Sequence, residues 1–293
     1  MKKSTIVLYH ATCPDGFTAA WAAWKKFRAH ATYFPVKHQV PPPKGVEGKE
    51  VFLLDFSYNA ARIQRLAAEN TRVTVLDHHV SARDDLRALF ERMGARTRKA
   101  HATSANLSLI YDVAHSGAFL AWRYFHPKKP VPQIVRYVED NDLWQFRLPH
   151  TRELSLFLDA HECAFPVWEK LASLFEKRKT RQACIEKGKY IARFADGIVK
   201  DVSSSACKVN FAGEVVLAAN SPVLRSEIGH ELVKKRPPFS IVWREKGGQI
   251  AVSLRSDGTF DVAKLAEKYG GGGHKSAAGF TLKQGEKIPW KVR

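Results

Sequence analysis

Short apolar runs alternate with helix-like stretches through the first half of the chain. Thr5–Tyr9, Val51–Asp55 and Val73–Leu76 are β-prone runs, whereas residues 16–28 and 60–70 have helical spacing of their apolar positions. Continuous apolar strands separated by helices are typical of a parallel sheet buried on both faces. The pattern therefore predicts an α/β fold with a parallel sheet in the N-terminal part.

The pattern changes twice further along the chain. Residues 116–200 have a mainly helical pattern, and from Cys207 on apolar runs with hairpin spacing surround one short helix. We therefore predict three parts: an N-terminal α/β domain over residues 1–165, a helical connector over 166–204 and a smaller α+β domain over 205–293.

The net charge of the chain indicates which class of partner it would bind. The 47 Lys and Arg residues exceed the 29 Asp and Glu residues, which gives a formal net charge of +18. Such a surplus concentrates polyanions near the surface, and nucleic acid is the usual partner of a chain with this charge. The alternative is a basic, solvated surface without a nucleic-acid partner.

Cysteine usage and hydropathy predict a cytoplasmic protein. None of the four cysteines forms a C-x-x-C pair, and a chain of 293 residues does not need disulfides to fold. The first residues lack the long apolar core and cleavage site of a signal peptide. No apolar run approaches the roughly 18 residues of a membrane span, so we expect no membrane association.

Acids and histidines follow the apolar runs of the first half. His10 follows the first run, Asp55 ends the second, and Asp77-His78-His79 follows the third. Ligands gather at the carboxyl ends of strands in open α/β sheets, so these side chains should converge. Imidazole and carboxylate together suit Mn²⁺, and also Mg²⁺ or Zn²⁺. No cysteine is expected to join them, which argues against a structural zinc site.

Each of these residues also has a simpler interpretation. A lone His10 could be a hydrogen-bonded strand-end histidine, and a lone Asp55 could be a turn residue or helix cap. Adjacent histidines directly after a β-run offer little to a core, which favours the metal interpretation. Two cations about 4 Å apart could then clamp a phosphoryl group, with Asp55 as a bridging carboxylate.

The chain resembles the DHH phosphoesterase superfamily. The resemblance rests on HATCPDGF (10–17), LLDF (53–56), VLDHH (75–79) and VEDNDLW (138–144), and on VSLRS (252–256) and GGGGHKSAAGF (270–280) for the DHH-associated C-terminal domain. It implies a metal-dependent hydrolase of phosphoric esters with Mn²⁺, as one or two ions, or Mg²⁺.

The resemblance implies a role for most of these residues. His10 and Asp15 match ligands of one metal, Asp55 matches the bridging carboxylate, and His78 matches a ligand of the second metal.

The remaining roles concern catalysis and the fourth motif. Asp77 matches a ligand or a carboxylate behind the ligands, and His79 matches the histidine that faces the scissile phosphate. Asp140 best matches the aspartate of the fourth motif, and Asp142 is the rival because the spacing permits either.

The first motif departs from the family pattern H-x-N-P-D-x-D. An extra residue lies between His10 and Pro14, and Phe17 stands where a second aspartate is expected. The second metal therefore loses a carboxylate. Either Asp142 or Asp77 compensates, or the second site is weak, or one ion suffices, or the chain is inactive.

Two glycine-containing segments could meet an anion. Gly271, Gly272 and Gly273 could bring backbone N–H groups close to a ligand, with His274 and Arg255 adding positive charge. The resemblance implies that these residues bind substrate, and the alternative is a flexible turn.

The second segment, Ser116-Gly117, could open a helix whose N–H groups bind an anion, or could be a plain helix cap.

Three functions stay open from the sequence. The first is an exonuclease-like phosphodiesterase acting on short RNA or single-stranded nucleic acid, which the net charge favours. The second is a phosphatase or phosphodiesterase of small phosphate esters such as nucleotide bisphosphates, cyclic dinucleotides or polyphosphate. The third is a non-catalytic nucleic-acid-binding protein, which the aspartate replaced by Phe17 would favour.

Overall fold

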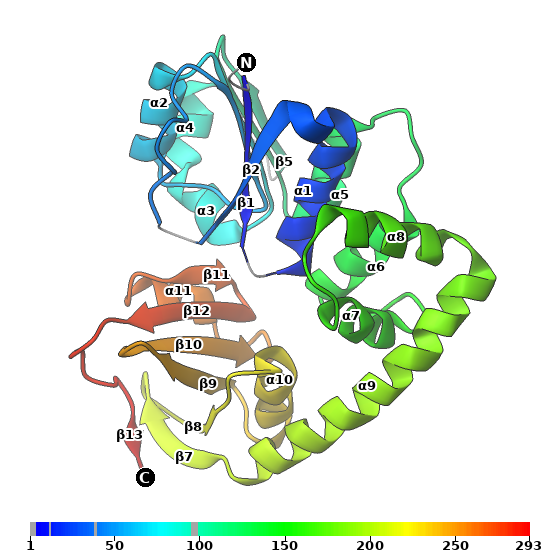
Figure 1. Ribbon diagram of the computed structural model, residues 1–293. Coiled ribbons are helices and arrows are strands. Elements are labelled where there is room, and N and C mark those ends of the chain that lie inside the picture. Colours follow the sequence, from blue (N-terminus) through cyan, green and yellow to red (C-terminus); the bar gives the residue numbers. More distant parts are fainter. Residues whose placement is uncertain (1–3, 12, 38–39, 95–98) are drawn as a thin grey trace. The chain divides into compact units, whose positions relative to one another are not determined.

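The chain folds into two compact units, Met1–Ala192 and Arg193–Arg293. The computed structural model describes residues 4–11, 13–37, 40–94 and 99–293 (Figure 1). Helix α9 (Arg178–Ser204) runs across the division and forms most of the segment predicted as a connector.

The N-terminal unit contains a sheet with strand order β2-β1-β3-β4-β6-β5. All neighbouring strands in it are parallel except β5 and β6. The strands are β1 (Thr5–His10), β2 (Ala31–Val36), β3 (Glu50–Leu54), β4 (Arg72–Asp77), β5 (Lys99–Thr103) and β6 (Leu107–Asp112). This sheet confirms the predicted α/β fold.

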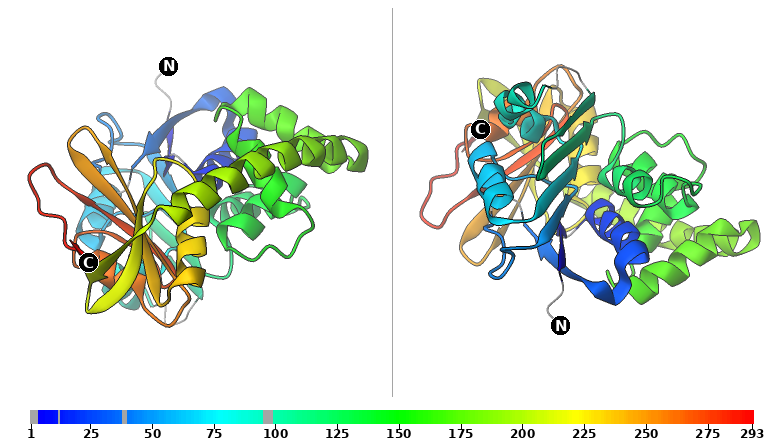
Figure 2. Two further views of the ribbon diagram at one scale, coloured as in Figure 1. Left: turned by 90° about the horizontal axis from the view of Figure 1, so that it is seen from below. Right: turned by 90° about the horizontal axis from the view of Figure 1, so that it is seen from above.

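Helices cover both faces of this sheet. The helices of this unit before α9 are α1 (Pro14–Phe27), α2 (Ala60–Glu69), α3 (Val80–Asp85), α4 (Arg87–Arg92), α5 (Gly117–Phe125), α6 (Gln133–Asp142), α7 (Thr151–Asp159) and α8 (Phe165–Glu176), with a 3₁₀ turn at Arg28–His30. Figure 1 and the right-hand view of Figure 2 show α1 and α5 on one face and α2 and α4 on the other.

The N-terminal unit has one hydrophobic core on each face of its sheet, because side chains alternate in direction along each strand. In β3, Val51 and Leu53 pack into the core on the α2 side, whereas Phe52 and Leu54 pack into the core on the α1 side. Successive side chains of a strand point to opposite faces, so a strand buried on both faces reads as a continuous apolar run. Asn59 starts α2 as predicted, since its side chain accepts a hydrogen bond from the N–H of Arg62.

The C-terminal unit is built on a sheet with strand order β11-β12-β10-β9-β8-β7-β13. Neighbouring strands of this sheet are antiparallel, except that β8 and β9 are parallel. The elements are β7 (Cys207–Phe211), β8 (Glu214–Asn220), α10 (Arg225–Lys235), β9 (Phe239–Lys246), β10 (Gln249–Ser256), α11 (Val262–Glu267), β11 (Gly272–His274), β12 (Ala277–Leu282) and β13 (Lys291–Val292). The predicted α+β character is confirmed.

Among the helices of the described residues, none combines the length and apolar character needed to cross a membrane.

Candidate metal centre

Asp55 lies at the centre of a cluster of acids and histidines where the parallel strands end. It follows β3, is 2% exposed and has a positive φ of 62°, a conformation that aspartate tolerates better than most residues. Its Oδ2 lies 3.4 Å from His10 Nδ1 and 3.3 Å from Cys13 Sγ. Its Oδ1 lies 3.1 Å from His78 Nε2. The two oxygens of one carboxylate therefore face two different sets of donors.

Besides the group formed by Asp55, Asp77 and His79, two sets of possible metal ligands lie at this carboxylate. The first contains His10, Cys13 and Asp55, and the second contains Asp15, His78 and Asp142. Within each set, one ligand atom per residue lies within 4.8 Å of the others. These side chains thus lie in one cluster at the strand ends, where the sequence predicts that they converge.

Asp15 is held by the N-terminus of helix α5. The N–H groups of Gly117 and Ala118 donate to its two carboxylate oxygens at 2.7 and 3.0 Å. Ser116 caps the same helix, since its Oγ accepts from the N–H of Phe119. The start of α5 therefore does meet an anion, and within the described residues that anion is the carboxylate of Asp15.

Asp77 organises the segment that carries both histidines. It is fully buried, and its Oδ1 accepts from the N–H groups of His78 and His79 at 2.7 and 3.2 Å. The same oxygen lies 2.8 Å from His79 Nδ1, and Tyr111 donates its hydroxyl to Oδ2 at 3.2 Å. Asp77 thus fixes the loop and the ring of His79.

The electrostatics of the cluster favour a bound cation. Burial would raise the pKa of Asp55, but hydrogen bonds from His10 and His78 hold it well below its usual range. Burial and the charges of Asp55 and Asp142 raise the pKa of Asp15 well above its usual range. Several buried carboxylates thus lie close together with too few positive charges to balance them. A divalent ion would supply the missing positive charge.

His78 carries part of the positive charge in the absence of a metal. Burial would lower its pKa, but the hydrogen bond to Asp55 and the charges of Asp142, Asp55 and Asp15 outweigh burial and raise the pKa to about 10. With imidazoles, carboxylates and a thiol at these separations, the residues present fit a divalent metal ion.

The structure separates the two aspartates of the fourth motif. Asp142 Oδ2 lies 3.6 Å from His78 Nε2, in the second set of ligands. Asp140 is buried and accepts from the N–H groups of Arg147 and Leu148 and from the hydroxyl of Thr151. Asp140 therefore shapes the segment after α6, and we propose Asp142 for the ligand role given first to Asp140.

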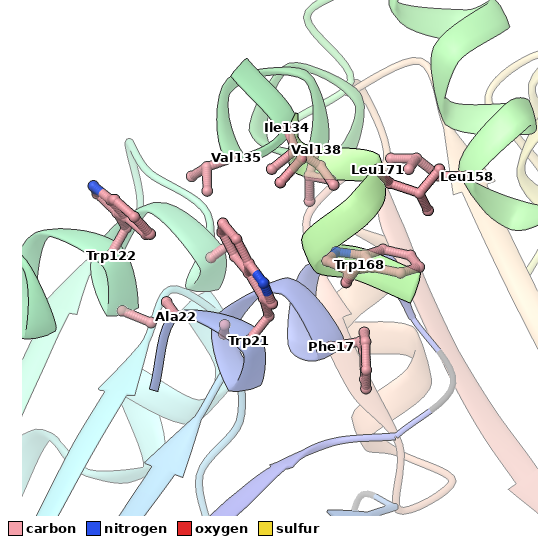
Figure 3. Packing of buried hydrophobic residues seen from close by; sticks show 14 of the residues in the cluster. Phe17, Trp21, Ala22, Trp122, Ile134, Val135, Val138, Leu158, Trp168 and Leu171 are labelled. Carbon is pink, nitrogen blue, oxygen red and sulfur yellow. The ribbon is translucent and has the colours of Figure 1, made fainter. Parts of the chain in front are cut away.

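Phe17, at the position of the expected second aspartate, lies in the hydrophobic core of the N-terminal unit. Its ring is 3% exposed and packs on Phe165 and Trp168, with ring centroids 5.2 and 5.0 Å away. Figure 3 shows Phe17 beside Trp168. This position of helix α1 thus contributes to the hydrophobic core and brings no oxygen to the cluster.

The expectation that no cysteine joins the cluster is wrong. Cys13 Sγ lies 3.4 Å from His10 Nδ1 and also accepts from the N–H of Gly16. Sequence reasoning noted the extra residue before Pro14 but not the sulfur it brings. It also missed the hydroxyl of Tyr111 behind Asp77, for which the sequence carries no local signal.

Gly117 is required for close packing rather than for backbone freedom. A Cβ atom at this residue would lie 2.5 Å from Asp55 Cβ and 2.6 Å from its Oδ1. Contacts that short do not occur between unbonded atoms, so only glycine lets helix α5 start directly against Asp55.

The C-terminal unit holds the residues predicted to bind substrate. Arg255 of β10 pairs with Ala277 of β12, and Ala277 pairs with His274 of β11. Directly paired residues share a face of the sheet, so Arg255 and His274 lie on either side of Ala277. Their backbones are two strand spacings apart, about 10 Å. Burial and then the charge of Arg225 lower the pKa of Arg255 to about 10.

The glycines beside His274 have a structural role of their own. A Cβ at Gly271 would lie 2.1 Å from the carbonyl oxygen of Gly279, and one at Gly273 would lie 2.5 Å from that of Ala277. Gly271 and Gly273 therefore permit close pairing of this hairpin, and Gly272 pairs with Gly279 in register. Substrate binding by this segment stays a prediction.

Comparisons with known proteins agree with this architecture. Residues 209–290 match the DHHA1 domain. An uncharacterized protein, R106, of Acanthamoeba polyphaga mimivirus is 28% identical over 301 residues, which cover 94% of this chain and 67% of that protein.

Two solved structures match this chain at low sequence identity. The DHH domain of a member of the s1p family of ribosomal proteins has a TM-score of 0.57 at 14% identity, covering 99% of this chain and 83% of that one. An exonuclease RecJ bound to manganese has a TM-score of 0.47 at 15% identity, covering 96% and 86%. This chain therefore shares the fold of a solved DHH domain, and its residues 209–290 match the DHHA1 domain, in agreement with the motifs of its sequence.

Proposed function

We propose that this chain is a metal-dependent phosphoesterase that hydrolyses phosphodiester bonds of short oligonucleotides or single-stranded nucleic acid. The observation that carries the proposal is the carboxylate of Asp55, whose two oxygens face two separate sets of ligands. A bridging carboxylate between two divalent ions is the arrangement that phosphoryl-transfer chemistry uses.

The chain's own residues divide the work at this centre. His10 and Asp55 would hold one ion, and Asp15, His78 and Asp142 would hold the other, with Asp55 between them. The resemblance grouped Asp15 with His10, but Asp15 Oδ2 lies 3.8 Å from His78 Nε2, so we propose it for the His78 ion instead. Mn²⁺ suits this mixed donor set, and Mg²⁺ is the harder alternative. The chemistry such ions supply is polarisation of the phosphoryl group and activation of water.

His79 would stabilise charge on the substrate. Its side chain is 26% exposed, and its ring centroid lies 4.5 Å from that of His78. With Nδ1–H donating to Asp77, the ring in its imidazolium form would donate Nε2–H to a phosphoryl oxygen. Asp77 acts through His79, as a positioning residue.

An exposed aromatic pair near the centre favours a substrate with bases. Trp144 and Phe146 are 39% and 38% exposed, with ring centroids 4.9 Å apart. Both follow Asp142 closely, and both have positive φ values of 55° and 49°. The segment that Asp140 holds therefore presents two rings to solvent, where bases could stack on them.

The C-terminal unit would hold a second part of the substrate. Burial and then the charge of Arg225 lower the pKa of Arg255, so a phosphate placed there would attract two guanidinium groups that otherwise repel each other. We propose that Arg255, His274 and the Gly271–Gly273 backbone bind a phosphate there. The net charge of +18 would draw a polyanion to the chain.

Hydrolysis of a labelled short RNA tests the proposal. With Mn²⁺ the full chain should release mononucleotides, and His78→Ala and Asp55→Ala should each remove this activity. His30→Ala, an exposed histidine outside the cluster, serves as the matched control and should keep it. Turnover that persists in both cluster variants would overturn the proposal.

A second comparison tests the kind of substrate. Trp144→Ala with Phe146→Ala should raise KM for the RNA about tenfold, since stacking contributes about 1–3 kcal/mol per base. The KM for an abasic oligonucleotide of equal length should not change. If small phosphate esters are cleaved and RNA survives, the phosphatase alternative replaces the oligonucleotide proposal.

A further inference from the structure

Cys13 occupies an unusual place for a cysteine. It is the N-cap of helix α1, where Ser, Thr, Asp and Asn are preferred and cysteine has no particular advantage. Its sulfur nevertheless points into the acidic cluster, 3.3 Å from Asp55 Oδ2 and 3.4 Å from His10 Nδ1. The start of the helix alone does not explain why this position holds sulfur.

We propose that Cys13 is a thiolate ligand of the metal ion held by His10 and Asp55. This inference rests on the proposed metal centre and adds a ligand to it. It also assigns a chemical preference to that half of the centre.

The distances within the first set support direct ligation. His10 Nδ1, Cys13 Sγ and Asp55 Oδ2 form a nearly equilateral triangle, with sides of 3.4, 3.3 and 3.4 Å. The point equidistant from its corners lies about 1.9 Å from each atom, slightly less than typical metal–nitrogen and metal–oxygen distances of about 2.0–2.2 Å and a metal–sulfur distance of about 2.3 Å. An ion just above the triangle would thus reach all three atoms with little movement.

The charge balance supports the same assignment. When the sulfur–metal bond forms, the thiol proton leaves to solvent and Cys13 becomes a thiolate. The thiolate and the carboxylate of Asp55 together neutralise a divalent ion, with His10 as a neutral ligand.

A thiolate changes which ion this half of the centre prefers. Sulfur ligands favour borderline ions such as Zn²⁺ and Co²⁺ over hard Mg²⁺, whereas Asp15 and Asp142 give the other half a harder set. The two halves should therefore differ in ion preference.

Cobalt titration of the full chain tests the assignment without recourse to activity. Co²⁺ added to the metal-free protein should produce a near-ultraviolet sulfur-to-cobalt charge-transfer band that saturates at one ion per chain. Cys13→Ser should abolish the band, and Cys163→Ser, the change of an exposed cysteine outside the cluster, should leave it intact.

Cys13→Asp provides a second variant, because aspartate is a good N-cap and supplies a carboxylate. It should still bind an ion and should favour Mg²⁺ over Co²⁺ at least about tenfold more than the unaltered chain does, since even the loss of an outer partner of a ligand changes metal affinity about 10–100-fold.

The outcomes separate this inference from the proposed function. If calorimetry detects cobalt binding but no charge-transfer band appears, or if the band survives in Cys13→Ser, the thiolate ligand is refuted and the metal centre stands. If neither Co²⁺ nor Mn²⁺ binds, the metal centre itself is refuted, and the inference with it.

Discussion

Gly117→Ala should damage the metal centre through a single added methyl group. The new Cβ would lie 2.5 Å from Asp55 Cβ, whereas unbonded carbon atoms approach to about 3.5 Å, so Asp55 or helix α5 must move by about 1 Å. Asp55 has little room to yield, because its N–H donates to the carbonyl of Leu76 and its carboxylate faces His10 and His78.

The structure sets the size of the expected effect. Overpacking of this kind typically lowers the free energy of unfolding by about 1–3 kcal/mol. A displacement of about 1 Å in a reacting group can reduce activity about 100-fold, and we expect a loss of that order in Mn²⁺-dependent hydrolysis. Mn²⁺ affinity should fall as well, because Asp55 faces both sets of ligands.

Isothermal titration with Mn²⁺, urea unfolding and RNA hydrolysis measure these effects. Gly197→Ala is the matched control, since a Cβ at this position of α9 meets nothing within 4 Å. That change should raise the free energy of unfolding by about 0.5–1 kcal/mol and leave Mn²⁺ binding unchanged. A Gly117→Ala protein with unaltered Mn²⁺ affinity and stability would refute the close packing on which the argument rests.

Three further predictions concern residues around the centre. Asp142→Ala should weaken Mn²⁺ binding at least about tenfold and change urea unfolding little. Asp140→Ala should lower the free energy of unfolding by about 3 kcal/mol, because it removes three hydrogen bonds to a buried carboxylate. The reverse pattern would return the ligand role to Asp140. Tyr111→Phe should lower the free energy of unfolding by about 1–2 kcal/mol in thermal or urea unfolding, since Asp77 Oδ2 loses its hydroxyl donor; unchanged stability contradicts this. The pKa of His78 is about 10, so an ion must displace a proton from this ring when it binds. Mn²⁺ affinity should therefore rise with pH from about 6.5 towards 10, by up to about tenfold per pH unit. Calorimetry in two buffers should detect the released proton, and a pH-independent affinity would contradict the ligand role.

The central strands were predictable because burial on both faces leaves a continuous apolar run. Strand β2 was missed, since it lies at the edge of the sheet and contains Pro35, which a central strand would not accommodate. The helical connector was predicted as one stretch from residue 166. Helix α8 instead ends at Glu176, and its Trp168 and Phe175 are buried in the core of the N-terminal unit.

The cluster was predictable only as far as it follows strand ends. His10, Asp55 and Asp77 directly end or follow strands, so topology alone brings them together. Asp140 and Asp142 stand two positions apart on one helix and therefore point in different directions, which spacing alone cannot resolve. Cys13 lies in a turn whose course depends on helix α1, so the position of its sulfur required coordinates.

Anomalous diffraction from crystals soaked in Mn²⁺ tests the metal centre most directly. We predict two anomalous peaks on either side of the Asp55 carboxylate, one in contact with His10 and Cys13 and the other with His78, Asp15 and Asp142. Well-ordered crystals with Mn²⁺ bound elsewhere, or with no peak beside Asp55 at saturating Mn²⁺, would contradict a metal-dependent phosphoesterase built on this cluster.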